Sequence, residues 1–233
     1  MFFFLQATNT TVTDTMQGIA DTVAGSEKIS YFGLLFKGGF MMIPLILLLF
    51  VAVFFIIERF LYIQKKAQLS ESLVNEVLDQ LYQGNIKGAE ALCISDKSSL
   101  GNVLRGGVSQ LGKPIEHIEK VLDIQSNIEL NEMENHTSYI SMISGIAPRL
   151  GFIGTILGVI RIFYDIASSG GNIAIGTITT GLYQKMITSG MGLIVGVIAF
   201  MGFHFLISKI DNYSMKLQKQ IFEFVKGIQK PVN

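Results

Sequence analysis

Three long apolar segments separate the polar parts of this chain. The first covers residues 38–57 (GGFMMIPLILLLFVAVFFII) and carries no charge, and the others cover residues 139–166 and 182–208. A helix of about 20 residues rises about 1.5 Å per residue and reaches about 30 Å, the thickness of the hydrocarbon core of a bilayer. The pattern therefore predicts an all-α integral membrane protein with three transmembrane helices.

Charged residues at the ends of these segments predict how the chain is oriented. Basic residues follow the first and third segments: Arg59, Lys65, Lys66, Lys209, Lys216 and Lys219. Cytoplasmic flanks of membrane helices are enriched in Lys and Arg. We therefore expect residues 58–138 and 209–233 on the cytoplasmic side, whereas residues 1–37 and the uncharged loop 167–181 lie outside.

The insert at residues 58–138 has the spacing of helices rather than strands. Apolar residues recur every four positions before Gly84 and Asn85 interrupt the pattern: Leu69, Leu73, Val77 and Leu81. After Pro114, a favoured first residue of a helix, no Gly or Pro occurs until Gly145. The sequence thus predicts a helical cytoplasmic domain whose last helix continues without interruption into the second span.

Two interpretations of residues 1–37 remain open. Ile19 and Val23 have helical spacing in a stretch rich in Thr and Ala, which is compatible with an amphipathic helix on the outer surface. A tail without regular structure accounts for the same composition.

Composition supports the membrane assignment and excludes several function classes. The chain of 233 residues is 49% hydrophobic and 15% charged, with a mean hydropathy of +0.47 and no net charge. A neutral chain lacks the basic field that nucleic-acid binding requires. Cys93 is the single cysteine, so neither an internal disulfide nor a metal motif is expected. With no nucleophile motif or phosphate loop, we expect no enzyme and no cofactor.

Small residues lie on one face of the second and third segments. The stripes consist of Ser144, Pro148, Gly151, Thr155 and Gly158 in one helix and Lys185, Thr188, Ser189, Gly192 and Gly196 in the other. Small residues four apart, such as Gly154 and Gly158, allow close helix packing, which is the structural interpretation. The functional interpretation is that the hydroxyls of Thr155, Thr188 and Ser189 line a polar path.

A proton path normally needs an ionisable group within the membrane. None of the stretches 38–57, 139–164 and 182–208 contains Asp or Glu, and Asp165 lies at the outer end of the second span. If protons cross here, we therefore expect another polypeptide to supply the acid.

Basic residues do occur within these segments. Arg149 lies about ten residues into the second span, where insertion of a charge costs roughly 2.5–3.5 kcal/mol at the helix centre. It fits a pore mouth, a salt bridge to a neighbouring subunit or a lipid headgroup. Arg161 and Lys185 lie toward the outer side and fit an acidic partner or phosphate headgroups.

Two segments resemble a known family. GIAPRLGFIGTILGVIRIF (residues 145–163) is similar to the second-span signature of the MotA/TolQ/ExbB proton-channel family, and ITSGMGLIVGVIAF (residues 187–200) is similar to its third-span pattern. Three spans with an outer N-terminus and a helical insert resemble the ExbB branch most. The resemblance covers nearly the whole chain from about Tyr31.

The resemblance implies a proton-driven motor in the bacterial inner membrane. Family members form pentamers whose second and third helices surround a dimer of a single-span ExbD- or TolR-like partner, and the partner's aspartate carries the proton. By position, Thr155 and Ser189 match the family's pore-lining threonines, with Thr188 beside them. A TonB- or TolA-like protein would receive the force, and the outer side would be the periplasm.

Two positions depart from the family pattern. Gln184 stands where many relatives have glutamate, and Ile198 stands where many have proline. The first puts a requirement for an acid at this place in doubt, and the second predicts a straighter third helix.

Three functions are therefore considered. An ExbB-like subunit would couple the proton motive force to TonB-dependent transport across the outer membrane. A TolQ-like subunit would use the same mechanism for envelope maintenance. A non-conducting membrane scaffold would use the glycine faces for assembly alone. A solute carrier is disfavoured, because the chain has neither duplicated halves nor paired broken helices.

Overall fold

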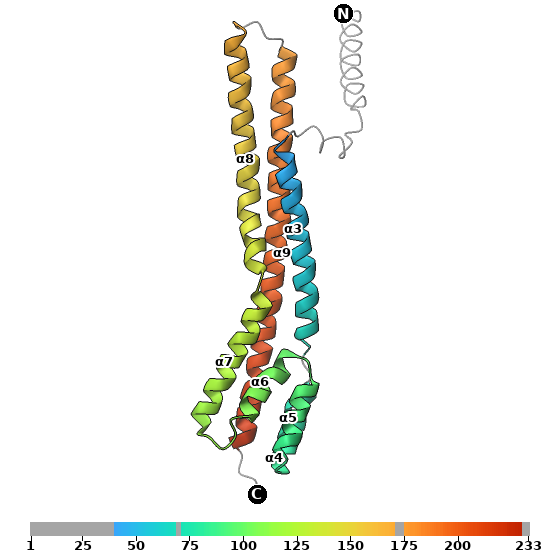
Figure 1. Cartoon of the computed structure of the whole chain (residues 1–233), viewed down its shortest axis with the longest axis vertical. Helices are drawn as coiled ribbons and strands as arrows, with labels where there is room; N and C mark the ends of the chain where they lie inside the picture. Colours follow the sequence, from blue (N-terminus) through green and yellow to red (C-terminus); the bar gives the residue numbers. More distant parts are fainter. Residues whose placement is uncertain (1–39, 69–70, 171–174, 230–233) are drawn as a thin grey trace, which may run out of the picture.

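The computed structural model describes residues 40–68, 71–170 and 175–229, and every regular element in these ranges is a helix (Figure 1). The helices are α3 (Met42–Lys66), α4 (Glu71–Tyr82), α5 (Ile86–Ser95), α6 (Ser99–Val108), α7 (Ile115–Glu134), α8 (Thr137–Ser168) and α9 (Ile175–Gln229). The expected all-α fold is thus confirmed for the described residues. Residues 1–37, for which the sequence left two interpretations open, lie outside the described residues.

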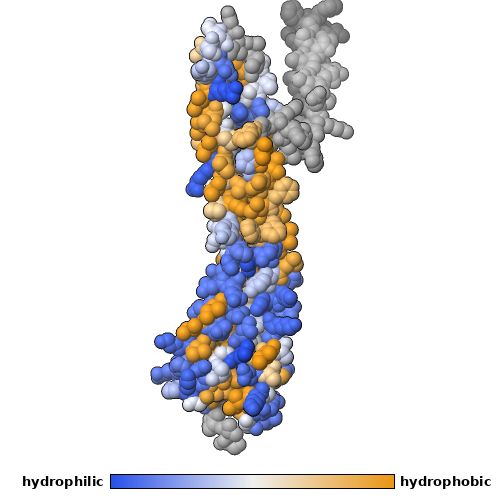
Figure 2. Space-filling view, in the orientation of Figure 1, coloured by the Kyte–Doolittle hydropathy of each residue, from blue (hydrophilic) through white to orange (hydrophobic). Residues whose placement is uncertain are grey.

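Three of these helices are long and apolar enough to cross a membrane: α3, α8 and the part of α9 from Ile178 onward. They run side by side in the upper part of the molecule in Figure 1. Figure 2 shows hydrophobic side chains gathered over this part and hydrophilic side chains over the part below it. No more than 28% of the most apolar stretch of any of the three helices is buried within the chain. Their outer faces are therefore suited to lipid or to neighbouring subunits.

Helix α3 has favourable residues at both of its ends. Pro44 lies in the first turn, where a missing N–H removes no helical hydrogen bond. Lys65 and Lys66 occupy the last turn, where positive charge interacts favourably with the helix dipole. Large side chains such as Phe50 and Phe54 are exposed, whereas the opposite face of the helix contacts α8 and α9.

Helices α4 to α7 lie beside the second half of α9 (Figure 1), and α4 and α7 contact it. The core of this polar part is formed by fully buried apolar side chains: Leu100, Leu104, Leu122, Leu217 and Phe224. Cys93 is also buried, and burial raises the pKa of its thiol to about 11. The thiol therefore stays protonated at neutral pH and packs as a small apolar group.

The expected continuous helix from Pro114 into the second span is wrong. Helix α7 ends at Glu134, Asn135 is extended with φ −52° and ψ 143°, and α8 begins at Thr137. His136 between them has a φ of 65°, in the left-handed region that non-glycine residues seldom adopt. The interruption contains neither Gly nor Pro, which is why the usual sequence signals of a helix break did not reveal it.

Candidate functional site

Helices α8 and α9 bring their backbones into close contact at Gly151 and Gly192. A Cβ atom placed on Gly192 would lie 2.7 Å from the carbonyl oxygen of Ala147 and 2.9 Å from Cα of Gly151. One placed on Gly151 would lie 3.1 Å from the carbonyl oxygen of Ser189. The neighbours at both positions are backbone atoms, which cannot rotate away. The crossing therefore needs glycine on both helices.

Two further glycines of the stripes, Gly158 and Gly196, also lie in this contact, together with Gly154. A Cβ on Gly196 would lie 2.5 Å from Cγ of Pro148 and 3.1 Å from the carbonyl oxygen of Ser144. One on Gly154 would lie 3.4 Å from Cγ2 of Thr188. One on Gly158 would collide with the aliphatic part of Lys185. We name this surface, formed by Gly151, Gly154, Gly158, Gly192 and Gly196, the glycine contact.

The three hydroxyl residues occupy different environments beside the glycine contact. Thr188 is only 1% exposed, and its Oγ1 donates to the carbonyl oxygen of Gln184 at 3.2 Å. Thr155 is half-buried and donates to the carbonyl oxygen of Phe152 at 2.6 Å, and Ser189 is also half-buried. Within one chain, Thr155 and Ser189 therefore remain partly accessible to another molecule, whereas the chain itself covers Thr188.

The basic side chains in the apolar part differ in exposure. Arg149 and Arg161 are exposed, whereas Lys185 and the neighbouring Gln184 are half-buried. Among the described residues, none of these basic groups forms an ion pair. Lys185 lays its methylene groups over Gly158 and thereby covers apolar helix surface with the uncharged part of its side chain.

Acidic side chains are nearly absent from the membrane helices. Helix α8 carries one carboxylate, Asp165, which is exposed near its C-terminal end, and residues 182–208 of α9 carry none. In the described ranges no three His, Cys, Asp or Glu side chains come together as metal ligands would. The glycine contact therefore brings together hydroxyls and close backbones without an acid of its own.

The structure also reveals a buried arginine whose role the sequence did not indicate. Arg59, which the sequence identified only as one of the basic residues that predict orientation, is 4% exposed. Its Nη1 donates to the carbonyl oxygen of Glu132 at 3.1 Å, and its Nη2 lies 2.9 Å from Nδ1 of His136. Its Nε lies 3.1 Å from Oε2 of Glu58. Because arginine only donates, Nδ1 of His136 accepts.

These contacts account for the break between α7 and α8. In a continuous helix the carbonyl of Glu132 would accept from the N–H of His136. Here the N–H of His136 donates to Oδ1 of Asn135 at 3.0 Å, and Arg59 satisfies the released carbonyl. The available sequence signal was the position of Arg59 on one helix face with Leu45, Ala52 and Ile63, all of which are buried.

Replacing Arg59 with methionine is expected to destabilise the protein by about 3 kcal/mol, because the change removes the donor to the Glu132 carbonyl and to Nδ1 of His136 and leaves Glu58 without its ion-pair partner. The measurement is thermal unfolding of the purified protein in detergent, followed by circular dichroism. Arg105→Met is the matched control: Arg105 is exposed and 3.6 Å from Glu90, so its loss should cost less than about 1 kcal/mol. Equal effects of the two changes would contradict the role assigned to Arg59.

Sequence comparisons with known proteins bear on the family of this chain. The model of the MotA/TolQ/ExbB proton channel family matches residues 95–219, which is more than half of the 233 residues. An ExbB-like biopolymer transport protein of Synechocystis sp. is 26% identical over 174 residues, which cover 74% of this chain and 68% of that protein.

Two further relatives carry different names. The biopolymer transport protein ExbB of Helicobacter pylori is 32% identical over 87 residues, covering 37% of this chain and 59% of the relative. The Tol-Pal system protein TolQ of Haemophilus influenzae is 23% identical over 106 residues, covering 45% of this chain and 46% of the relative. The family match includes both segments that carried the resemblance, residues 145–163 and 187–200. The chain therefore belongs to the MotA/TolQ/ExbB proton channel family.

Proposed function

We propose that this chain is an ExbB-like motor subunit that couples proton flow across the bacterial inner membrane to TonB-dependent transport. The observation that carries the proposal is the combination of partly accessible hydroxyls, Thr155 and Ser189, with the lack of any carboxylate at membrane depth in α8 and α9. A single-span partner of the ExbD or TolR type would supply the aspartate. The family membership and the ExbB names among the relatives support this assignment.

The assembly that we propose is a pentamer whose α8 and α9 helices surround a dimer of the partner. One chain alone leaves large apolar side chains of α8 exposed, among them Phe152, Ile156 and Ile160. Lipid or other protein surfaces must cover them in a membrane. Five copies would turn the hydroxyl-bearing sides of α8 and α9 toward a shared centre and the exposed face of α3 toward lipid.

The hydroxyls suit a proton path because they both donate and accept. Thr155 donates to the carbonyl of Phe152 and retains lone pairs that can accept from a protonated carboxyl group or a water molecule. When the partner's carboxyl group loses its proton, the threonine hydroxyl can rotate and donate to the carboxylate instead. Each charge that crosses the membrane releases about 2.3 kcal/mol per 100 mV of membrane potential. The energy released by a few protons is therefore enough to drive a mechanical step.

We further propose that residues 58–138 and 209–233 face the cytoplasm and that residues 1–37 and 167–181 face the periplasm. The basic residues that follow α3's apolar part and those after residue 208 support this orientation. Arg149, Arg161, Gln184 and Lys185 would then meet partner chains or lipid headgroups near the two mouths of the channel.

Deletion of the gene distinguishes the two candidate motor functions, TonB-dependent uptake and envelope maintenance. An ExbB-like role predicts loss of receptor-dependent uptake of iron complexes with an intact envelope, and restoration of uptake by the wild-type gene. The second candidate function is envelope maintenance, and its support is the similarity to TolQ. This function predicts leakage of periplasmic proteins and sensitivity to detergent instead. Leakage with normal uptake would overturn the ExbB-like assignment.

A further inference from the structure

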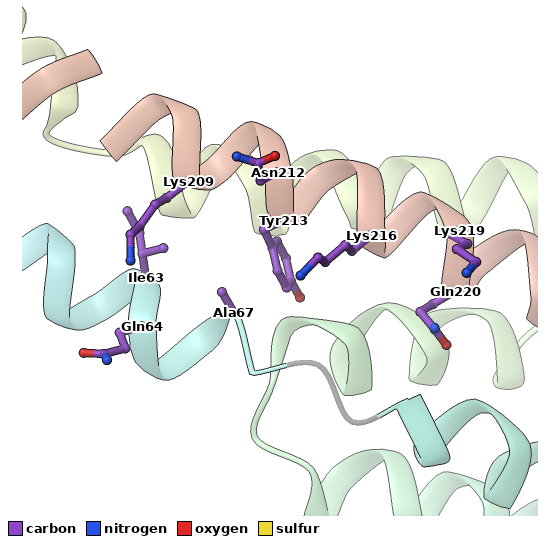
Figure 3. Close-up of a pocket in the computed structure, with 9 residues that line it drawn as sticks. All are labelled: Ile63, Gln64, Ala67, Lys209, Asn212, Tyr213, Lys216, Lys219 and Gln220. Atoms are coloured by element: carbon purple, nitrogen blue, oxygen red, sulfur yellow. The ribbon is translucent and has the colours of Figure 1, made fainter. Parts of the chain in front are cut away.

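A basic groove lies between the end of α3 and the second half of α9. It encloses about 570 Å³ (Figure 3). Ile63 of α3 and Ala67, which directly follows this helix, line one side, and α9 contributes three lysines, Lys209, Lys216 and Lys219. Among the described residues, no Asp or Glu lines this groove and none of the three lysines forms an ion pair. The groove therefore concentrates positive charge that no described acidic side chain neutralises.

The groove begins at the edge of the apolar part of the molecule. The uncharged stretch of α3 ends at Ile57, and Phe60 lies about 4.5 Å further along the helix axis. Nζ of Lys209 lies 4.7 Å from the ring centroid of Phe60 and 5.3 Å from that of Phe205. Polar headgroups extend about 5–7 Å beyond the hydrocarbon core. With the edge of that core placed at Ile57, this ammonium group would lie at the level of lipid phosphates.

The direction of α9 turns Lys216 toward the same level. The helix runs from the apolar part into the polar part, and side chains on a helix lean toward its N-terminus. Figure 3 shows Lys209 extending toward the end of α3 and Lys216 extending back along α9 toward Tyr213. The lysines at positions 209, 216 and 219 are seven and three residues apart, so they share one face of the helix.

A buried acceptor at the inner end of the groove complements these donors. Gln220 lines the groove, is 8% exposed, and its Oε1 has no hydrogen-bond partner among the described residues. A buried acceptor without a partner is costly and needs a donor, which water or a ligand hydroxyl can supply. Ammonium groups match a phosphate, whereas a carbonyl oxygen matches a hydroxyl group.

From these observations we propose that the groove binds the headgroup of an anionic phospholipid that carries a free glycerol hydroxyl, of the phosphatidylglycerol type. The phosphate contacts Lys209 and Lys216, a headgroup hydroxyl donates to Oε1 of Gln220, and the acyl chains lie along the exposed face of α3. The bound lipid connects the ends of α3 and α9, and its single negative charge reduces the repulsion among the three lysines on one helix face. This site is separate from the glycine contact and does not depend on the motor function.

The test measures lipid selectivity of the purified assembly by native mass spectrometry after reconstitution in nanodiscs. The discs contain equal amounts of phosphatidylglycerol and phosphatidylcholine. We expect the wild type to retain phosphatidylglycerol in preference to phosphatidylcholine. In the triple variant Lys209→Gln, Lys216→Gln, Lys219→Gln, the ratio of bound phosphatidylglycerol to bound phosphatidylcholine should fall at least about tenfold. The control is the triple variant Lys97→Gln, Lys113→Gln, Lys120→Gln, which removes the same charge from exposed positions on the polar part. It should keep the preference.

A second variant tests the hydroxyl contact. Gln220→Met should lower the preference for phosphatidylglycerol over phosphatidic acid, which has the phosphate but no glycerol headgroup. Unchanged selectivity in the lysine triple variant, or an equal loss in the control, would overturn the proposal. Displacement of the lipid by inorganic phosphate or glycerol phosphate at millimolar concentration, or by an acidic peptide, would assign the groove to a soluble ligand and would also overturn it.

Discussion

Replacing Gly192 with alanine is expected to destabilise the folded protein by about 1–3 kcal/mol, although the change adds a single methyl group. The added Cβ would lie 2.7 Å from the carbonyl oxygen of Ala147 and 2.9 Å from Cα of Gly151. Neither atom can rotate away, so α8 and α9 must separate along the glycine contact. The measurement is the midpoint of thermal unfolding in detergent, together with the yield of assembled protein on native gels.

Gly190 provides the matched control two residues away on the same helix. A Cβ on Gly190 would meet nothing within 4 Å in the chain. Gly190→Ala should therefore leave stability unchanged or raise it by roughly 0.5–1 kcal/mol, because alanine favours the helix. If the two variants unfolded at the same temperature, close backbone approach would not be what holds α8 against α9.

Replacing Thr155 with valine is expected to reduce proton-driven activity by about tenfold or more while the complex still assembles. Valine keeps the shape of threonine but removes the hydroxyl, and a hydrogen bond to a charged group contributes about 1.5–3 kcal/mol, where about 1.4 kcal/mol equals a factor of ten. Thr155 is half-buried, so its hydroxyl can reach a molecule outside the chain. The measurements are energised uptake in cells and proton flux in vesicles, both normalised to assembled protein.

Two controls separate the hydroxyl from the shape of the side chain. Thr155→Ser keeps the hydroxyl and should retain most of the activity. Thr180→Val removes an exposed hydroxyl that also donates to a helix carbonyl, that of Gly176 at 2.8 Å, and should have little effect. Normal flux and uptake in Thr155→Val would favour the scaffold interpretation, in which the small residues serve assembly alone.

The glycines and the hydroxyl residues of the two membrane helices differ in how closely the neighbouring helix covers them. The five glycines all lie between α8 and α9, where periodicity had placed them on one face of each helix. The three hydroxyls had the same periodicity, yet Thr188 is covered by the chain and Thr155 and Ser189 are not. Helical spacing states which residues share a face, but it does not state how deeply a neighbouring helix covers that face.

The sequence by itself determined the three apolar helices, the helical insert and the family. Each of these depends on local properties, since a bilayer demands a certain length of apolar helix and the family signature is a contiguous run of residues. The tertiary structure alone decided the break at Asn135 and His136, because Arg59, which holds it, lies 73 and 77 residues from its partners. It also decided the basic groove, whose walls come from α3 and α9. Both features arise where distant segments meet, and the hydrophobic period of one helix carries no information about the side chains that a distant segment brings to it.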